Sequence, residues 1–319
     1  MRSSVTVMPR NPRHLPRPGA LIEITHRTIQ GKYLLCPSSP RVGQIVVGCL
    51  ARAQKITGAV VHAVVVLTNH YHLIASFESV EQMARFMHHF NGNLSKEIGR
   101  LHGWRGTLWD GRYKPIAITD EPDAQLARLR YLLAQGCKEG LVLSPRDWPG
   151  VTTARALADG RDSLHGIWID RTAWHAGQSR REKLTEADVT EQERLQLTPL
   201  PALAHLGAEQ RCREITRMVE QIEQETQAMH RHEGTTPMGA SAACRQDPHD
   251  SPREVKRSPA PRFHAATGAA RRTLVEGFRQ FVATYRSAAA RLAAGEVGVR
   301  FPENCFPPGL PFVPPSVAG

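Results

Sequence analysis

The sequence lacks any apolar run long enough to span a membrane. Its first 18 residues are rich in arginine and proline and contain no apolar segment of the kind that a secretory signal needs. It also lacks a CxxC pair, because its six cysteines are widely spaced and two of them fall inside apolar runs. Such cysteines are typical of free thiols in a reducing compartment. We therefore expect a cytoplasmic protein that is not attached to a membrane.

The net charge of the chain is strongly positive. Its 319 residues include 41 Lys and Arg against 30 Asp and Glu, which gives a formal net charge of +11. This surplus favours a polyanionic partner such as nucleic acid, although many basic proteins bind none. The length exceeds that of the usual single domain, which predicts one substantial domain with an appended region.

The first half of the chain alternates between expected strands and helices. Strands are expected at 20–28, 60–67, 70–77 and 113–119, where β-branched and apolar residues are bounded by turn signals. Apolar periodicity predicts helices at about 42–56, 83–101 and 122–135, the last of them broken at Gly136. This order predicts an α+β protein with a ferredoxin-like antiparallel sheet and helices on one face.

The second half of the chain has weaker signals. The expected organisation is a disordered leader at 1–18, a main domain at 19–158, a charged helical extension at 159–232, a linker at 233–262, and a helix with a Pro-rich tail at 263–319. No motif after the main domain indicates a function. Its helices and charge are compatible with DNA contact or with a homodimer.

Two histidines separated by one residue follow an apolar strand, in the string LTNHYHLI at 67–74. Side chains alternate between the faces of a strand, so His70 and His72 point the same way, close enough to share a metal ion, and Tyr71 points to the other face. Alone this pair is weak evidence for a metal site. In a chain with 15 histidines, a surface or packing pair has the same pattern.

A tyrosine lies on the polar side of the helix expected at 122–135. At about 100° per residue, Tyr131 lies opposite a stripe of leucines, and Arg128 and Gln135 share its face. We expect this tyrosine to face outward. The same position is also typical of an ordinary, partly exposed tyrosine with its hydroxyl in water.

Four segments of the sequence, in order, resemble motifs of single-tyrosine transposases of the histidine-hydrophobic-histidine (HUH) type. The string at 67–74 resembles the family's MPNHxHLL, and GTLWDGRY at 106–113 resembles G-x-L-W-x-x-R-Y/F. YLLAQGCKEGLV at 131–142 resembles Y-I-x-x-N-P-V-R-A-G-L-V, and DWP at 147–149 resembles D/Y-W/Y-P. The resemblance covers about residues 20–155 and is greatest to the REP-associated tyrosine transposases of the insertion sequence 200-like family.

This resemblance implies an HUH nuclease fold and a DNA transposase, a metal-dependent endonuclease and strand transferase that acts on single-stranded or hairpin DNA through a 5′-phosphotyrosine. Tyr131 would be the nucleophile, and His70, His72 and Gln135 would hold Mg²⁺ or Mn²⁺. Hard divalent ions accept such ligands and complete their shell with water and phosphate. The family's usual Asn-Pro is Gln135-Gly136 here, and Gln135 keeps an amide oxygen at the same spacing.

Basic and aromatic side chains near these motifs are the expected DNA contacts, because single strands are bound by cations along the backbone and by rings that stack on bases. They are Arg27, Trp104, Arg105, Trp109, Arg112, Tyr113, Lys114 and Arg128. Trp109 and Tyr113 are equally compatible with core packing. Two other functions stay open: a non-catalytic DNA-binding protein of the same fold, and a His-based metal hydrolase, which would need further His or Asp ligands.

Overall fold

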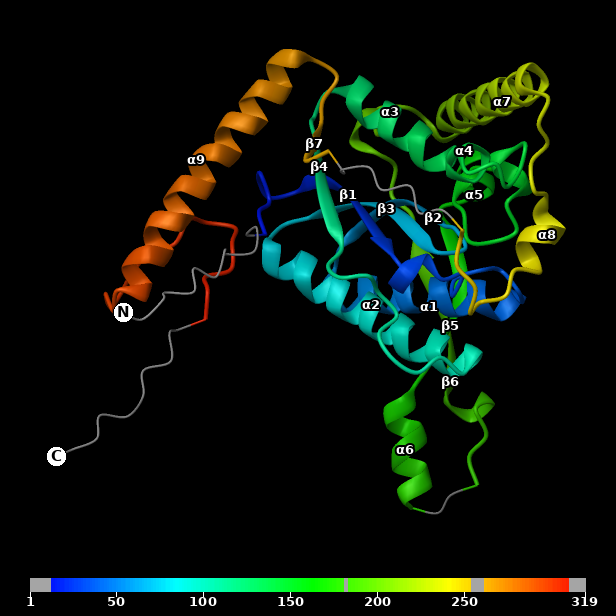
Figure 1. Cartoon of the computed structure of the whole chain (residues 1–319), viewed down its shortest axis with the longest axis horizontal. Helices are drawn as coiled ribbons and strands as arrows, with labels where there is room; N and C mark the ends of the chain where they lie inside the picture. The colour runs from blue at the N-terminus through cyan, green and yellow to red at the C-terminus, as the bar shows by residue number, and fades with distance from the viewer. Residues whose placement is uncertain (1–12, 181–182, 254–260, 310–319) are drawn as a thin grey trace.

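The computed structural model describes residues 13–180, 183–253 and 261–309 (Figure 1). The elements of the main sheet and its helices are β1 (Ala20–Arg27), α1 (Pro40–Thr57), β2 (Val60–Val66), β3 (His70–Phe77), α2 (Val80–His102), β4 (Lys114–Ile118), α3 (Pro122–Leu133) and α4 (Gln135–Lys138). They are followed by α5 (Ala154–Ala158), β5 (Ser163–Ile169), α6 (Arg171–Ser179), β6 (Thr190–Gln196), α7 (Ala208–Glu233), α8 (Ala240–Cys244), β7 (Phe263–His264) and α9 (Gly268–Ala293).

The central sheet has the order β2-β3-β1-β4-β7. Strand β1 pairs antiparallel with β3 and β4, and β2 pairs antiparallel with β3, whereas β7 adds to β4 in parallel. In this order, β3 lies between β1 and β2, the two strands of the first βαβ unit, and β4 lies on the other side of β1. This is the ferredoxin-like strand order. The expected α+β class, with a mostly antiparallel sheet and a helical C-terminal region, is confirmed.

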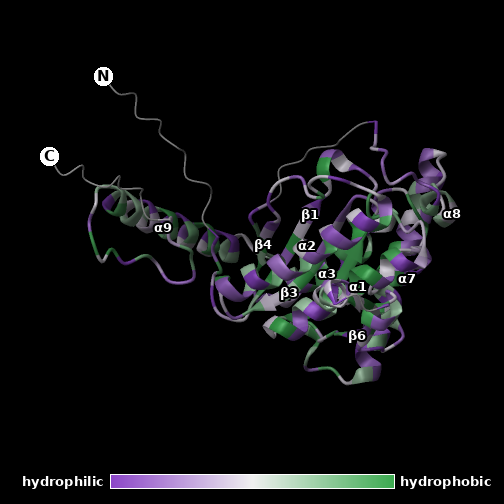
Figure 2. Ribbon diagram, turned by 90° about the horizontal axis from the view of Figure 1, so that it is seen from below, coloured by the Kyte–Doolittle hydropathy of each residue, from purple (hydrophilic) through white to green (hydrophobic). Residues whose placement is uncertain are grey.

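Helices cover both faces of this sheet. Helices α1 and α2 bury the face that carries Ile22, Ile24 and Leu73. Helix α3 covers the face that carries Leu21 and Ile74, and α7 packs on α3, α4 and α5. We expected helices on one face, but the central strands are apolar on both sides, which requires a layer on each. Figure 2 shows the apolar residues gathered at the centre of the main body, with α9 projecting away from it.

A second, two-stranded sheet of β5 and β6 packs on α1, within the region expected to be a helical extension. Its docking depends on two glycines, since a Cβ atom on Gly48 of α1 would overlap the backbone of Ile167, and one on Gly166 of β5 would overlap the backbone of α1. Backbones approach this closely only where neither residue has a side chain. The small sheet is therefore packed directly against the main domain.

We expect Gly48→Ala to destabilise the protein by about 3 kcal/mol or more, because the added methyl must displace backbone rather than a mobile side chain. The matched control is Gly92→Ala. Gly92 lies inside α2, and a Cβ atom added there would meet no atom within 4 Å outside its own helix backbone. Gly92→Ala is expected to stabilise by about 0.5–1 kcal/mol, because alanine favours a helix. Urea denaturation of both variants measures the difference, and equal effects would contradict the close contact.

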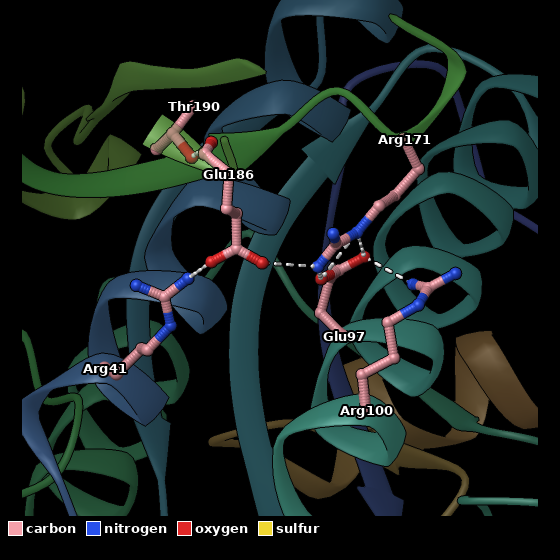
Figure 3. Close-up of polar contacts among 6 residues, drawn as sticks. All are labelled: Arg41, Glu97, Arg100, Arg171, Glu186 and Thr190. Atoms are coloured by element: carbon pink, nitrogen blue, oxygen red, sulfur yellow. Dashed lines mark hydrogen bonds and ion pairs between the residues drawn. The ribbon is translucent and has the colours of Figure 1, made fainter. Parts of the chain in front are cut away.

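Ion pairs hold α6 against α1 and α2 (Figure 3). Arg171 at the start of α6 donates from Nε (2.9 Å) and Nη2 (2.5 Å) to Glu97 of α2, which also accepts from Arg100. Glu186 bridges Arg171 to Arg41 of α1. Because Glu97 is only 6% exposed, its charge needs these partners to remain in the protein interior.

Part of the expected linker is packed against the main domain. Within it, the backbone N–H of Met238 donates to the carbonyl of Gly140 (2.8 Å), and the N–H of Tyr33 donates to the carbonyl of Asp250 (2.9 Å). Residues 234–253 are therefore held to the main domain by backbone hydrogen bonds. Residues 254–260 lie outside the described residues.

The expected disordered leader falls mostly on residues 1–12, which lie outside the described residues. Within 13–18, Leu15 is fully buried in the main core, and the His14 ring stacks on Phe281 of α9 at 4.1 Å between centroids. Burial of Leu15 therefore holds residues 13–18 against the main domain. Among the helices of the described residues, none is both long and apolar enough to cross a membrane.

Candidate active site

The two histidines lie on β3, near the middle of the sheet. The centroids of the His70 and His72 rings are 5.3 Å apart. Tyr71 points to the opposite face, where it is fully buried and donates a hydrogen bond of 2.9 Å to Asn91 Oδ1. This is the alternation that the strand pattern predicts.

Both histidines are held through Nδ1 by an oxygen acceptor. His72 Nδ1 lies 2.8 Å from Glu23 Oε1, and His70 Nδ1 lies 2.7 Å from Asn69 Oδ1. The Asn69 amide nitrogen donates to the carbonyl of Gly31 at 3.0 Å, which leaves its oxygen facing His70. Each Nδ1 therefore faces an oxygen acceptor, which leaves each Nε2 as the ring nitrogen that can bind a metal.

Burial favours the neutral form of the His70 ring. Burial lowers its pKa well below the ordinary value, and the neighbouring charges of His72 and Arg27 lower it further. A neutral imidazole is the form that binds a metal ion.

Glu23 of β1 is a site residue that the sequence analysis missed. Its side chain is fully buried, and its Oε2 accepts hydrogen bonds from Arg128 Nη2 (2.5 Å) and His264 Nε2 (3.1 Å). Burial alone would raise the pKa of Glu23, but the hydrogen bonds from His264 and His72 and the charges of His72 and Arg128 outweigh it. Together they hold the pKa well below the usual range. The only sequence signal was a lone acidic residue inside an apolar strand.

His264 reaches Glu23 from a position 241 residues later in the chain. It lies on β7, whose pairing with β4 is fixed by a hydrogen bond of 2.9 Å from Thr119 N–H to the His264 carbonyl. Glu121 holds the next turn, since its carboxylate accepts from the N–H groups of Ala266 and Thr267 at the start of α9. A two-residue strand has no periodicity that sequence analysis can detect.

Tyr131 of α3 lies beside His72. Their ring centroids are 5.7 Å apart in an edge-to-face arrangement. The guanidinium of Arg128 is 3.8 Å from the tyrosine ring centroid, and Lys138 Nζ is 3.9 Å from it. The ring is half-buried and lines a cleft of about 870 Å³ that α7 and residues 264–266 also line. The structure thus places Tyr131, the expected nucleophile, beside His72, one of the expected metal ligands.

Gln135 is placed differently from the expected continuous helix. Helix α3 ends at Leu133, and Gln135 begins the short helix α4, which contains Gly136 rather than ending there. A Cβ atom on Gly136 would lie 3.1 Å from Val142, so the glycine lets α4 pack closely. Gln135 is 2% exposed and its Nε2 donates to the Tyr131 carbonyl at 2.9 Å. Its Oε1 is therefore the end of the amide left for another partner.

Among the expected DNA contacts, two aromatic residues are packed within the protein. Tyr113 is 7% exposed. The Trp109 ring stacks on His26 at 4.4 Å, and its Nε1 donates to the Asn91 carbonyl. These two rings therefore serve the core as well as bordering the surface.

The other expected contacts are distributed over several surfaces. Arg105, Arg112 and Lys114 are exposed. Trp104 is half-buried and donates from Nε1 to the Thr107 carbonyl. Arg27 ends β1 directly opposite His70. Arg128, 14% exposed, is committed to Glu23 through Nη2, while its buried Nε has no partner among the described residues.

Within the described residues, no group of three or more His, Cys, Asp and Glu side chains could hold a metal ion. The two histidines are therefore a partial donor set, and an amide oxygen such as that of Gln135 is not counted in such groups. Imidazole nitrogens and an amide oxygen are donor types that divalent metal ions accept, alongside water and phosphate.

Comparisons with known proteins find likeness only at the level of structure. No protein-family model matches the sequence, and no curated protein matches it. One similar solved structure is a REP-associated tyrosine transposase bound to a REP hairpin, 17% identical, covering 48% of this chain and 86% of that one with a TM-score of 0.38. Another is a putative transposase from Deinococcus radiodurans R1, 16% identical, covering 35% of this chain and 88% of that one with a TM-score of 0.27.

Proposed function

We propose that this protein is a DNA transposase that cuts and rejoins single-stranded or hairpin DNA through Tyr131, with Mg²⁺ or Mn²⁺ held by His70, His72 and Gln135. The observation that carries the proposal is the meeting of Tyr131 with His72, whose Nε2 is left free by the hydrogen bond from Nδ1 to Glu23. The motif resemblance is what assigns His70 and Gln135 to the same site.

The residues around Tyr131 suit a reaction at a phosphodiester. In the proposed step, the Tyr131 hydroxyl oxygen attacks phosphorus, the phenolic proton leaves, and the bond from phosphorus to the 3′ oxygen breaks. The products are a 5′-phosphotyrosine and a 3′-hydroxyl, which takes up a proton. Arg128 and Lys138 flank the ring at 3.8 and 3.9 Å, where their charges offset those of the phosphate.

The bound metal ion would act as a Lewis acid on the scissile phosphate. Glu23 orients His72, and Asn69 orients His70, so the two imidazoles are fixed before an ion arrives. Because one phosphodiester replaces another of similar energy, the strand can be resealed without a nucleotide cofactor.

The test is formation of a covalent adduct with a labelled hairpin oligonucleotide in Mg²⁺ or Mn²⁺. We expect Tyr131→Phe to abolish the adduct and to leave binding unchanged, because only the attacking oxygen is lost. The matched control is Tyr33→Phe, a second half-buried tyrosine, which should form the adduct normally. Cleavage that survives Tyr131→Phe would contradict the proposal, and binding without any adduct would favour a non-catalytic DNA-binding protein.

A further inference from the structure

A second cleft, of about 1020 Å³, opens on the face of the sheet opposite the candidate active site. It follows β4 and is bordered by β7, α9 and the segment that precedes β1. Along β1, Ile22 and His26 line this cleft, whereas Glu23 points to the other face and binds His72. The alternation of side chains along the strand therefore separates the two sites.

Among the described residues, four cations line this second cleft and no acidic side chain does. They are Arg13, Arg112, Lys114 and Arg262. Throughout the described ranges, none of the four forms an ion pair with a carboxylate. Several unneutralised cations around one cavity create a positive potential that attracts an anion.

Aromatic rings and unpaired polar atoms complete the lining. The half-buried ring of Phe263 meets that of Phe278, with centroids 5.9 Å apart. The hydroxyl of Tyr113, a residue 7% exposed, and Nε of Arg13 are buried with no hydrogen-bond partner among the described residues. Nδ1 of His14 and Nδ1 of His26, which also line the cleft, are buried and unpaired in the same way. Buried polar atoms are nearly always paired, so these four atoms in one cleft point to a missing polar ligand.

We propose that this cleft binds one nucleotide of a nucleic-acid single strand. Its phosphate would meet Arg112, Lys114 and Arg262, and its base would lie against Phe263 with the Tyr113 hydroxyl at a base edge. An anionic group joined to a flat ring suits both halves of the lining. Arg262 and Phe263 give the C-terminal region a part in binding. The inference rests on the proposed function only in taking the strand to be DNA.

The test is fluorescence anisotropy of a labelled single-stranded oligonucleotide with the full chain in EDTA, titrated with salt. We expect the double variant Arg112→Ala/Arg262→Ala to weaken binding and to lower the slope of log affinity against log salt by up to about 0.7, since the cleft neutralises one phosphate and each neutralised phosphate of a single strand contributes about 0.7. The charge-matched control is Arg271→Ala/Arg286→Ala, two exposed residues of α9 outside the cleft. Equal losses in the two double variants would overturn the proposal.

Phe263→Ala tests base stacking separately and is expected to weaken binding about tenfold or more. Unchanged affinity in this variant would contradict a base in the cleft. Competition with thymidine monophosphate shows whether the cleft takes a strand or a free nucleotide. If thymidine monophosphate fails to displace the oligonucleotide, the result supports a strand. If it displaces the oligonucleotide at equal nucleotide concentration, the result overturns the proposal in favour of a free nucleotide. Because binding is read in EDTA, its result is independent of adduct formation at Tyr131.

Discussion

Removing the carboxylate of Glu23 is expected to cost more stability than any other single change at the site. Glu23→Ala should lower the free energy of unfolding by about 3–5 kcal/mol, because it leaves Arg128 buried without its partner. Glu23→Gln keeps the shape of the side chain but loses its charge, and should lower Mn²⁺ affinity by about 10–100-fold, since His72 loses its anionic acceptor. Urea denaturation and Mn²⁺ titration measure the two effects.

The control is Glu78→Gln, an exposed carboxylate just after β3, which should change neither quantity. The dependence on pH gives a further check. The pKa of Glu23 is lowered on folding, so its ion pairs stabilise the protein above the unfolded pKa of about 4.5 and lose this contribution as the pH falls. The loss of stability below that pH should therefore be less steep in Glu23→Gln, and an unchanged slope would contradict the buried ion pairs.

Replacing either of the two histidines proposed to bind the metal is expected to abolish the adduct and to reduce Mn²⁺ affinity by more than about 100-fold, because removing a ligand costs more than removing the group that orients it. His70→Ala and His72→Ala should behave alike, since each Nδ1 is held by an oxygen and neither Nε2 has a hydrogen-bond partner in the described part of the chain. Electron paramagnetic resonance of free Mn²⁺ measures the affinity.

The control for these variants is His88→Ala, an exposed histidine of α2, for which wild-type Mn²⁺ affinity is expected. The result against the account would be Mn²⁺ binding that survives the loss of both His70 and His72. Retained binding would place the metal elsewhere, and it would leave the anchored imidazoles without the role proposed for them.

The sequence predicted the parts of the fold and site that local patterns determine. The alternation of His70, Tyr71 and His72 follows from strand geometry, and the ferredoxin-like order follows from the succession of strands and helices. The break between α3 and α4 was not predictable, because the apolar spacing continues through Ala134, where the structure divides the two helices.

Residues that act through distant contacts were missed for a different reason. Glu23 and His264 meet only because β7 adds to the edge of the sheet at β4, and no local pattern records such a pairing. The docking of β5 on α1 similarly depends on Gly48 meeting Gly166. Single glycines in a helix or strand carry no sequence signal for their partner.

Mass-spectrometric mapping of the residue that carries the DNA tests the central claim most directly. Trypsin cuts after Arg130 and Lys138, and the peptide between them, YLLAQGCK, contains Tyr131 as its only hydroxyl side chain. After reaction with a hairpin oligonucleotide in Mn²⁺ and nuclease trimming, the account predicts a nucleotide on this peptide, attached to Tyr131. A nucleotide attached to any other peptide, or to Cys137 in this one, would contradict it.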